Sequence, residues 1–420
     1  CGEKPMKSER KVWFNDQTIY EVNLRQYTKE GTIQAFKNHL PRLKNMGVGI
    51  LWMMPIHPIG EINRKGSLGS YYSIKDYYEI NPEFGTLKEF KNLVNEIHEL
   101  GMYVIIDWVA NHTSWDNAIS ASNPEWYTKN SNGNFMPPKD TDWSDVIDLD
   151  YSKSPLRKYM IDAMKYWIKE INIDGFRCDV AGMIPNDFWE KSIKELNQIK
   201  PIFMLAEWED PKLLDAGFSA DYNWTLYHNL KDLASGKKSI LKLEDYLKKN
   251  PKGYPKKAVR MNFLDNHDEN SWGRVMIDHF GPLVYPMMTL NFTLPGIPMI
   301  YSGQESKLAK KLEFFEKDII EWNDFADQEF YTGLINFRKS HSAFWTDNKN
   351  IKFLDGLENG MVGFMRWNDQ SSFVIIINLS NKTYELNDSS NTKNLIMKDV
   401  NSSNDSIFPY GYKIFQNKDI

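Results

Sequence analysis

Between about residues 17 and 344, short apolar runs alternate with longer stretches whose apolar residues recur every three or four positions. The helical spacing is clearest in 87–101, where one stripe holds Leu87, Phe90, Leu93, Val94, Ile97 and Leu100. Continuous apolar runs such as VGILWMMP (48–55) are typical of strands that are covered on both faces. The pattern predicts helices over 32–47 (ending at Gly47), 87–101, 185–199, 229–250, 281–294 and 327–341.

Eight apolar runs predict strands, at 18–24, 48–55, 102–109, 173–179, 201–208, 218–224, 257–268 and 296–305. Strands that alternate with helices over this length indicate an α/β protein with a parallel sheet. The sheet is either open or closed into a (β/α)₈ TIM barrel, and the count of eight favours the barrel.

Two stretches break the alternation. The segment 112–151 after the third strand is polar, rich in Asn, Pro and aromatic residues, and without a clear period; a loop of this length is usually functional. Near the end, MVGFMRW and FVIIINLS flank a turn and predict a β-hairpin over 361–367 and 373–380. The predicted organisation is a tether at 1–16, a barrel from 17–111 and 152–344, an inserted domain at 112–151, and a small antiparallel β domain at 345–420.

Composition narrows the function. A net charge of −5 argues against a nucleic-acid partner, which usually meets a basic face. The 14 Trp, 21 Tyr and 23 Phe suit stacking on sugar rings as well as core packing. No apolar run is long enough to span a bilayer.

The two cysteines define no disulfide framework. Cys178 is expected to be a small buried thiol on the outer face of a barrel strand. The beginning CGEKPMKSERK resembles a mature bacterial lipoprotein, and the alternative is an arbitrary start of the numbering. A lipid on Cys1 would anchor the protein, so we expect an extracytoplasmic location in the periplasm or at the cell surface, with membrane contact only through that lipid.

Polar residues collect where four of the predicted strands end. At this end of a barrel they indicate catalysis rather than stability. Each has a simpler explanation alone: Arg177 and Asp179 as a structural ion pair, Glu207 as a helix cap, His267 as a core histidine. The four groups are Asp107 with Asn111 and His112, Arg177 with Asp179, Glu207, and Asn266 with His267 and Asp268.

Three carboxylates without a Cys/His cluster favour glycoside hydrolysis, which needs one ionised carboxylate and one acid of raised pKa. Arg177 suits Asp179 for the ionised role, because a nearby cation favours the charged form. Glu207 suits the acid, because neighbouring carboxylates would hold its proton.

At this point the chain resembles the α-amylase family, glycoside hydrolase family thirteen. Four motifs of the family occur in order, and SYYSIKDYYEINPEFGT (70–86) and PGIPMIYSGQE (295–305) support them. The four are DWVANH (107–112), GFRCDVAGM (175–183), LAEW (205–208) and FLDNHD (263–268).

The resemblance implies a (β/α)₈ barrel with a short inserted domain after strand three and a C-terminal β-sandwich. It implies that Asp179 is the nucleophile, Glu207 the general acid and then base, and Asp268 the group that holds sugar hydroxyls and stabilises the transition state. Four further residues would bind the same sugar or position the nucleophile: Tyr72 by stacking, His112 and His267 through hydroxyls, and Arg177 by orienting Asp179.

The motifs depart from the family at two places. Gly182 and Met183 stand where many calcium-dependent members have Lys-His, and Ser73 replaces a frequent Asp. The first change puts the family's calcium site in doubt, although Asn111 and the Asp-rich stretch 140–150 would be its remaining ligands. No metal or other cofactor is expected to be required.

The resemblance favours an endo-acting, retaining α-glucan hydrolase that cleaves α-1,4 bonds in starch-like glucans or maltooligosaccharides. An α-glucosidase, an α-1,6-acting enzyme or a transglycosylase shares the four motifs, and a non-catalytic glycan-binding lipoprotein is the alternative from another class. The short inserted domain predicts an open cleft or a preference for short maltooligosaccharides. The Gly-rich loop 57–72 is expected to form one wall of the cleft.

Overall fold

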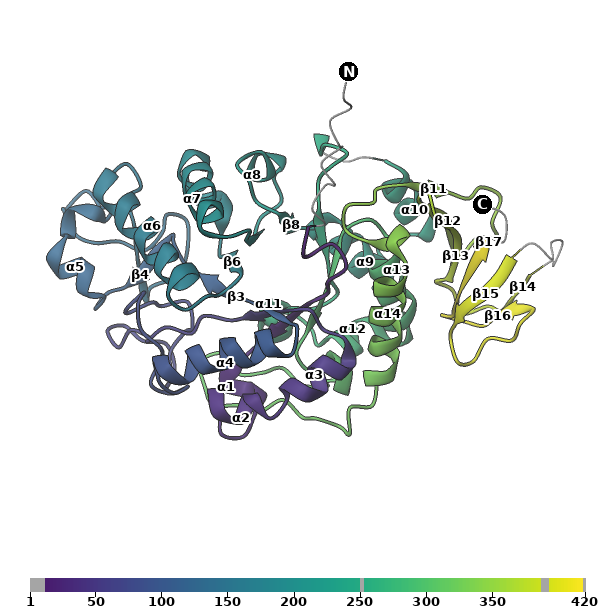
Figure 1. The fold of residues 1–420 in the computed structure, drawn as a ribbon, viewed down its shortest axis with the longest axis horizontal. Helices are drawn as coiled ribbons and strands as arrows, with labels where there is room; N and C mark the ends of the chain where they lie inside the picture. The colour runs from purple at the N-terminus through teal and green to yellow at the C-terminus, as the bar shows by residue number, and fades with distance from the viewer. Residues whose placement is uncertain (1–11, 250–252, 387–392, 418–420) are drawn as a thin grey trace, which may run out of the picture.

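The structure, a computed structural model, describes residues 12–249, 253–386 and 393–417 and has a closed barrel of parallel strands at its centre (Figure 1). Around the barrel the strands follow the order β1-β10-β9-β8-β7-β6-β3-β2, and β1 closes the ring by pairing with both β10 and β2. The predicted α/β barrel is therefore confirmed. Its strands are β1 (Ile19–Val22), β2 (Ile50–Met53), β3 (Tyr103–Trp108), β6 (Gly175–Cys178), β7 (Phe203–Ala206), β8 (Ala220–Tyr222), β9 (Arg260–Asn262) and β10 (Ile297–Tyr301).

Helices surround the barrel, and two of the predicted ones are each divided in two. The stretch 32–47 forms α2 and α3, with Pro41 in the first turn of α3, where its missing N–H costs nothing. Gly47 ends α3 at φ +95°, as a left-handed cap requires. The helices from β1 to β7 are α1 (Leu24–Tyr27), α2 (Ile33–Lys37), α3 (Leu40–Met46), α4 (Leu87–Glu99), α6 (Ser154–Lys169) and α7 (Asn186–Ile199).

The second half of the barrel carries more, shorter helices. The stretch 229–250 lies in α9 and α10, which are separated by a turn at Gly236. Because α11 begins at His267, the strand predicted over 257–268 is limited to β9. These helices are α8 (Pro211–Asp215), α9 (Trp224–Ala234), α10 (Ile240–Lys248), α11 (His267–Trp272), α12 (Met276–Phe280), α13 (Val284–Thr293) and α14 (Gln328–Ser340).

The segment inserted after β3 contains little regular structure. It holds β4 (His112–Ser114), which pairs antiparallel with β5 (Val146–Asp148), and the short helix α5 (Ala118–Ser122). These elements are too short to produce a readable period in the sequence. The inserted segment and the C-terminal sheet lie at opposite ends of the molecule (Figure 1).

The C-terminal part is antiparallel β structure. One sheet has the order β11-β12-β13-β17-β15, and β14 pairs separately with β16. The predicted hairpin is confirmed as β12 and β13. The strands are β11 (Ile351–Phe353), β12 (Met361–Trp367), β13 (Ser372–Asn378), β14 (Tyr384–Glu385), β15 (Lys393–Lys398), β16 (Ser406–Ile407) and β17 (Tyr412–Asn417).

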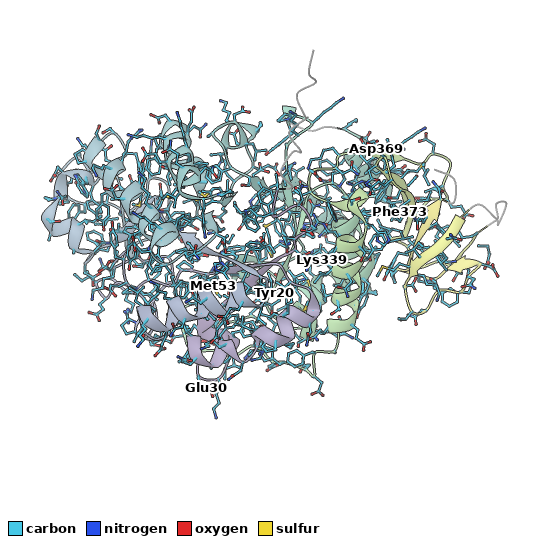
Figure 2. The ribbon with its side chains drawn as sticks, in the orientation of Figure 1. Tyr20, Glu30, Met53, Lys339, Asp369 and Phe373 are labelled. Atoms are coloured by element: carbon cyan, nitrogen blue, oxygen red, sulfur yellow. The ribbon has the colours of Figure 1, made fainter. Side chains whose placement is uncertain are left out.

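The C-terminal sheet is joined to the barrel by buried groups. Phe373 on β13 lies at this junction (Figure 2), with its ring 5.1 Å from that of Phe344. Arg366 on β12 is fully buried and donates to the carbonyl oxygens of Thr293, Ala343, Asn348 and Asn350. One cation thus satisfies carbonyls from both parts of the chain.

Aromatic residues pack at the amino-terminal ends of β3 and β7. Trp13 stacks on Tyr103 at 4.1 Å and Phe14 meets Phe203 edge-on at 4.9 Å. Trp13 and Phe14 therefore pack on the barrel, although both fall within the stretch 1–16 predicted as a tether. Cys1 and its predicted lipid lie outside the described residues.

Two other sequence expectations concern Cys178 and membrane-spanning segments. The thiol of Cys178 is free and buried, as predicted. Among the helices of the described residues, none has both the length and the apolar character needed to cross a membrane.

Candidate active site

A cavity of about 510 Å³ lies at the carboxyl ends of the barrel strands. Four of the lining groups follow barrel strands: Asp179 comes directly after β6, Glu207 after β7, and His267 and Asp268 open the helix that follows β9. The structure thus brings six of the seven predicted residues to one cavity, namely Tyr72, His112, Asp179, Glu207, His267 and Asp268.

Arg177, the seventh, is buried beneath the cavity and contacts three carboxylates. Its Nη1 donates to Asp107 at 2.9 Å and to Asp179 at 2.8 Å, while Nη2 lies 3.0 Å from Oε1 of Glu207 without hydrogen-bond alignment. Its Nε donates to the hydroxyl of Tyr222 at 3.0 Å. The sequence predicted only the pair with Asp179, whereas the guanidinium is shared by both groups proposed for the chemistry.

The carboxyl of Glu207 has a raised pKa. Burial raises the pKa of its carboxyl, Arg177 opposes the shift, and the charges of Asp179 and Asp268 add to it, giving a pKa of about 8. Like charges were expected to hold the proton, but burial is the larger cause. At neutral pH Glu207 therefore carries the proton that a leaving oxygen needs.

Asp179 differs from Glu207 in its partners. Burial raises its pKa above the ordinary value, and Arg177 acts against burial to favour the carboxylate. The backbone between the two groups is constrained: Val180 has φ +38°, a conformation that a β-branched residue rarely adopts. In this conformation its N–H donates to Oε2 of Glu207 at 2.7 Å.

A second charged cluster lies beside the first. The ring of His267 contacts Glu21 through Nδ1 and approaches Asp268 through Nε2 at 3.3 Å. Burial alone would lower the pKa of His267, but Asp268 and Glu21 outweigh it and raise that pKa well above 6.5. Burial acts to raise the pKa of Asp268, but the cationic imidazole outweighs it and holds that pKa below its ordinary value.

Tyr72 and His112 complete the walls. The hydroxyl of Tyr72 donates to Asp107 at 2.9 Å, and its ring lies nearly parallel to that of His267, with centroids 5.3 Å apart. Burial lowers the pKa of His112 to about 4, so its imidazole is neutral and can donate and accept hydrogen bonds with hydroxyls.

Sequence reasoning missed Glu21, Trp52 and Tyr222. Trp52 donates its indole N–H to Asp107 at 3.1 Å, and Tyr222 accepts from Arg177. Glu21 had a readable signal: it is the one charged residue in the otherwise apolar and buried strand β1. A lone carboxylate in a buried strand needs a partner, and His267 is that partner.

The departure at Gly182 has a structural explanation. A Cβ at Gly182 would lie 2.1 Å from Cε2 of the Trp208 indole, so the tryptophan lies directly against this glycine. Trp208 follows Glu207 and is 38% exposed. The indole therefore takes the space in which a side chain at position 182 would begin.

The residues left for a family-type calcium site are engaged elsewhere. Asp148 accepts from Thr128, Asp145 pairs with Lys65, and the amide nitrogen of Asn111 faces Nδ1 of His112. Ca²⁺ requires six to eight converging oxygens. In the described part of the chain no group of three or more His, Cys, Asp or Glu side chains is arranged to hold a metal.

The comparison with known sequences agrees with this geometry. The family profile described as "Alpha amylase, catalytic domain" matches residues 8–359. The chain belongs to the α-amylase family. It is thus a glycoside hydrolase by family, and its barrel strands carry the family's motifs at the cavity.

Individual relatives are moderately similar. A crystal structure of an α-amylase from Lactobacillus plantarum shares 30% identity with a TM-score of 0.85, covering 96% of this chain and 99% of that one. A maltogenic α-amylase, AmyB, from Thermotoga neapolitana shares 32% with a TM-score of 0.82, covering 97% and 98%. Alpha-amylase MalA of Haloarcula japonica is 26% identical over 392 residues, which are 88% of this chain but 56% of MalA.

Proposed function

We propose that this protein is a retaining α-glucan hydrolase that cleaves α-1,4-glucosidic bonds in starch-like glucans or maltooligosaccharides by double displacement. The observation that carries the proposal is that Glu207 and Asp179, which both contact Arg177, differ in their protonation. Glu207 has a pKa of about 8 and is protonated, whereas Asp179 accepts a hydrogen bond from the guanidinium. Two carboxyl groups in different protonation states are what a retaining glycosidase requires.

In the first step an Asp179 oxygen attacks the anomeric carbon while Glu207 gives its proton to the departing glycosidic oxygen. The covalent glycosyl-enzyme forms, and the aglycone leaves as an alcohol. In the second step the Glu207 carboxylate takes a proton from water, which attacks the same carbon and releases Asp179. Two inversions give net retention of the α configuration.

The remaining groups act on the sugar rather than on the bond. Asp268, kept ionised by cationic His267, faces the developing positive charge of the oxocarbenium-like transition state. Tyr72 offers a ring face for the sugar, and neutral His112 offers hydrogen bonds to its hydroxyls. We propose that no metal or other cofactor takes part, since Asp145, Asp148 and the amide nitrogen of Asn111 have partners within the protein.

Two relatives are named maltogenic α-amylase and cyclomaltodextrinase, which supports α-glucans as the substrate class. The non-catalytic alternative is disfavoured because Asp179, Glu207 and Asp268 all line the cavity.

The test compares wild type with Asp179→Asn on a maltooligosaccharide ladder and on panose, with products resolved by chromatography and the anomer followed by NMR. We expect early release of α-anomeric products from α-1,4 bonds, lost in the variant. Cleavage confined to the α-1,6 bond of panose would indicate a debranching-type enzyme. No turnover of any α-glucan by folded wild type would refute the proposal.

A further inference from the structure

One side of the active-site cavity is crossed by a segment of the loop between β2 and α4, residues 60–69, which we call the crossbar. Lys65 of the crossbar and Ser70 just after it line the cavity together with the catalytic groups. The segment leads within three residues to Tyr72, the aromatic wall of the site. The crossbar is therefore part of the cavity wall and not a distant surface loop.

The crossbar is held by the inserted segment on one side. Lys65 Nζ donates to the carbonyl oxygen of Asp142 at 3.2 Å and lies 3.7 Å from the Asp145 carboxylate. Asp142 and Asp145 also line the cavity. Lys65 thus joins the crossbar to the segment inserted after β3.

On the other side it is held by the loop that follows β10. Ser67 donates its N–H to Glu316 Oε1 at 2.9 Å and its hydroxyl to Oε2, while Leu68 N–H donates to the Phe315 carbonyl at 3.0 Å. A Cβ at Gly66 would lie 2.5 Å from Cβ of Phe315, so the two loops are in direct contact. The crossbar is consequently held at two places by separate parts of the chain that also line the cavity.

The base of the crossbar is fixed by Arg25, which is fully buried. Arg25 donates to the carbonyl oxygens of Leu68 at 3.2 Å and Gly69 at 3.0 Å, and pairs with Glu83 at 2.8 Å. Its guanidinium also lies 4.3 Å from the centroid of the Tyr71 ring. A buried cation with this many partners holds the loop in one position rather than allowing it to open.

The chemistry assigns a direction to the cavity. Glu207 protonates the oxygen that leaves with the aglycone, so the aglycone lies on the side of Glu207 and Trp208. Trp208, which lies against Gly182, and Met183 are among the exposed large apolar side chains. In the proposed mechanism Tyr72 and His267 would hold the sugar on the other side of the scissile bond, and the crossbar joins that side of the cavity through Ser70 and Tyr72.

We propose that the crossbar is a stop for the non-reducing end of the substrate. The enzyme then acts from that end and releases only glucose or maltose, because the chain cannot pass beyond the crossbar. A cavity of about 510 Å³ is in the lower half of the range for small-molecule sites, which suits a short terminal segment. This inference rests on the proposed α-glucan hydrolysis and replaces the endo action expected from the sequence.

The test uses two p-nitrophenyl maltoheptaosides that differ only in a 4,6-ethylidene acetal on the non-reducing glucose. We expect wild type to cleave the free glycoside and to cleave the blocked one roughly 100-fold more slowly, the discrimination of which a tight pocket is capable. Similar rates on both would overturn the crossbar proposal and leave the hydrolase intact. No cleavage of either would refute the proposed function, and the crossbar proposal with it.

A variant links the result to the segment. Replacing residues 62–66 by one glycine removes Lys65 and its bridge to the inserted segment, and we expect it to hydrolyse the blocked glycoside at a rate near that of the free one. Lys158→Ala is the matched control, because it removes an exposed lysine of α6 that pairs with Asp162 and lies outside the crossbar. If the shortened variant folds and still discriminates between the two glycosides as wild type does, the assignment is overturned. If it does not fold, the ratio of the two cleavage rates measured with wild type decides.

Discussion

Replacing Glu207 by Gln should abolish activity and make the protein more stable, by an amount that grows with pH. The Glu207 side chain is 14% exposed, and its pKa rises from 4.5 to about 8 on folding. Between these values the folded protein binds a proton that the unfolded chain has lost. The free energy of unfolding of wild type therefore falls as pH rises through this window. The variant lacks this dependence, because Gln has no proton to lose.

The magnitude follows from about 1.4 kcal/mol per pH unit for each such group. From pH 4.5 to pH 7 the variant should gain at most about 3 kcal/mol over wild type. The gain should stay below this ceiling, because Asp179 and Glu207 share Arg177 and the titration of one carboxyl depends on the charge of the other. Near pH 4.5 both proteins carry a neutral side chain at this position and should differ little.

The assay is denaturant or thermal unfolding of both proteins at several pH values between about 5 and 8, at one scan rate. The control is Glu195→Gln, which removes a carboxylate paired with Lys165 on the surface helices and should show no pH-dependent gain. If the stability difference between Glu207→Gln and wild type does not change with pH across this range, the claim that Glu207 is buried in its protonated form is wrong.

Three further predictions concern the same site. Arg177→Lys should lower kcat at least ~100-fold, measured on maltotriose at saturation, because one ammonium cannot hold the carboxylates that the guanidinium fork reaches; an activity within tenfold of wild type would contradict this. Gly182→Ala should reduce kcat/KM by displacing the Trp208 indole beside the acid, and adding Trp208→Ala should give the activity of Trp208→Ala alone; additive losses would count against the contact. Dialysis against EDTA should leave rate and Tm unchanged, and a loss reversed by Ca²⁺ would show that oxygen ligands assemble after all.

The sequence predicted the barrel well because each β/α unit has its own hydrophobic periodicity, which is a local property of the chain. The apolar runs gave the strands, and the stripe on 87–101 matches α4. The division of two predicted helices was missed, because the apolar pattern continues across the breaks near Pro41 and Gly236. The inserted segment was not readable because its strands are only three residues long.

For the site, the sequence located the polar groups at the strand ends but did not show that several of them contact the same Arg177 guanidinium. Arg177 and Asp179 are two residues apart, so their pairing was visible, whereas the contact between Arg177 and Glu207 depends on how neighbouring strands β6 and β7 stand in register. The pairing of Glu21 with His267 spans 246 positions along the chain and required the closed ring. Distances across a barrel are set by its closure, which no local pattern encodes.

Arg366 has a consequence for how this protein can be divided. Its guanidinium, on a strand of the C-terminal sheet, is bonded wholly to carbonyl oxygens, including those of Thr293 and Ala343 in the barrel part of the chain. Cutting the chain after residue 344 would leave those oxygens without their donor, at about 1–3 kcal/mol for each that remains buried. The C-terminal sheet is thus no detachable module, and a catalytic fragment engineered for exchange between relatives should carry it along, melting with the barrel as one cooperative unit.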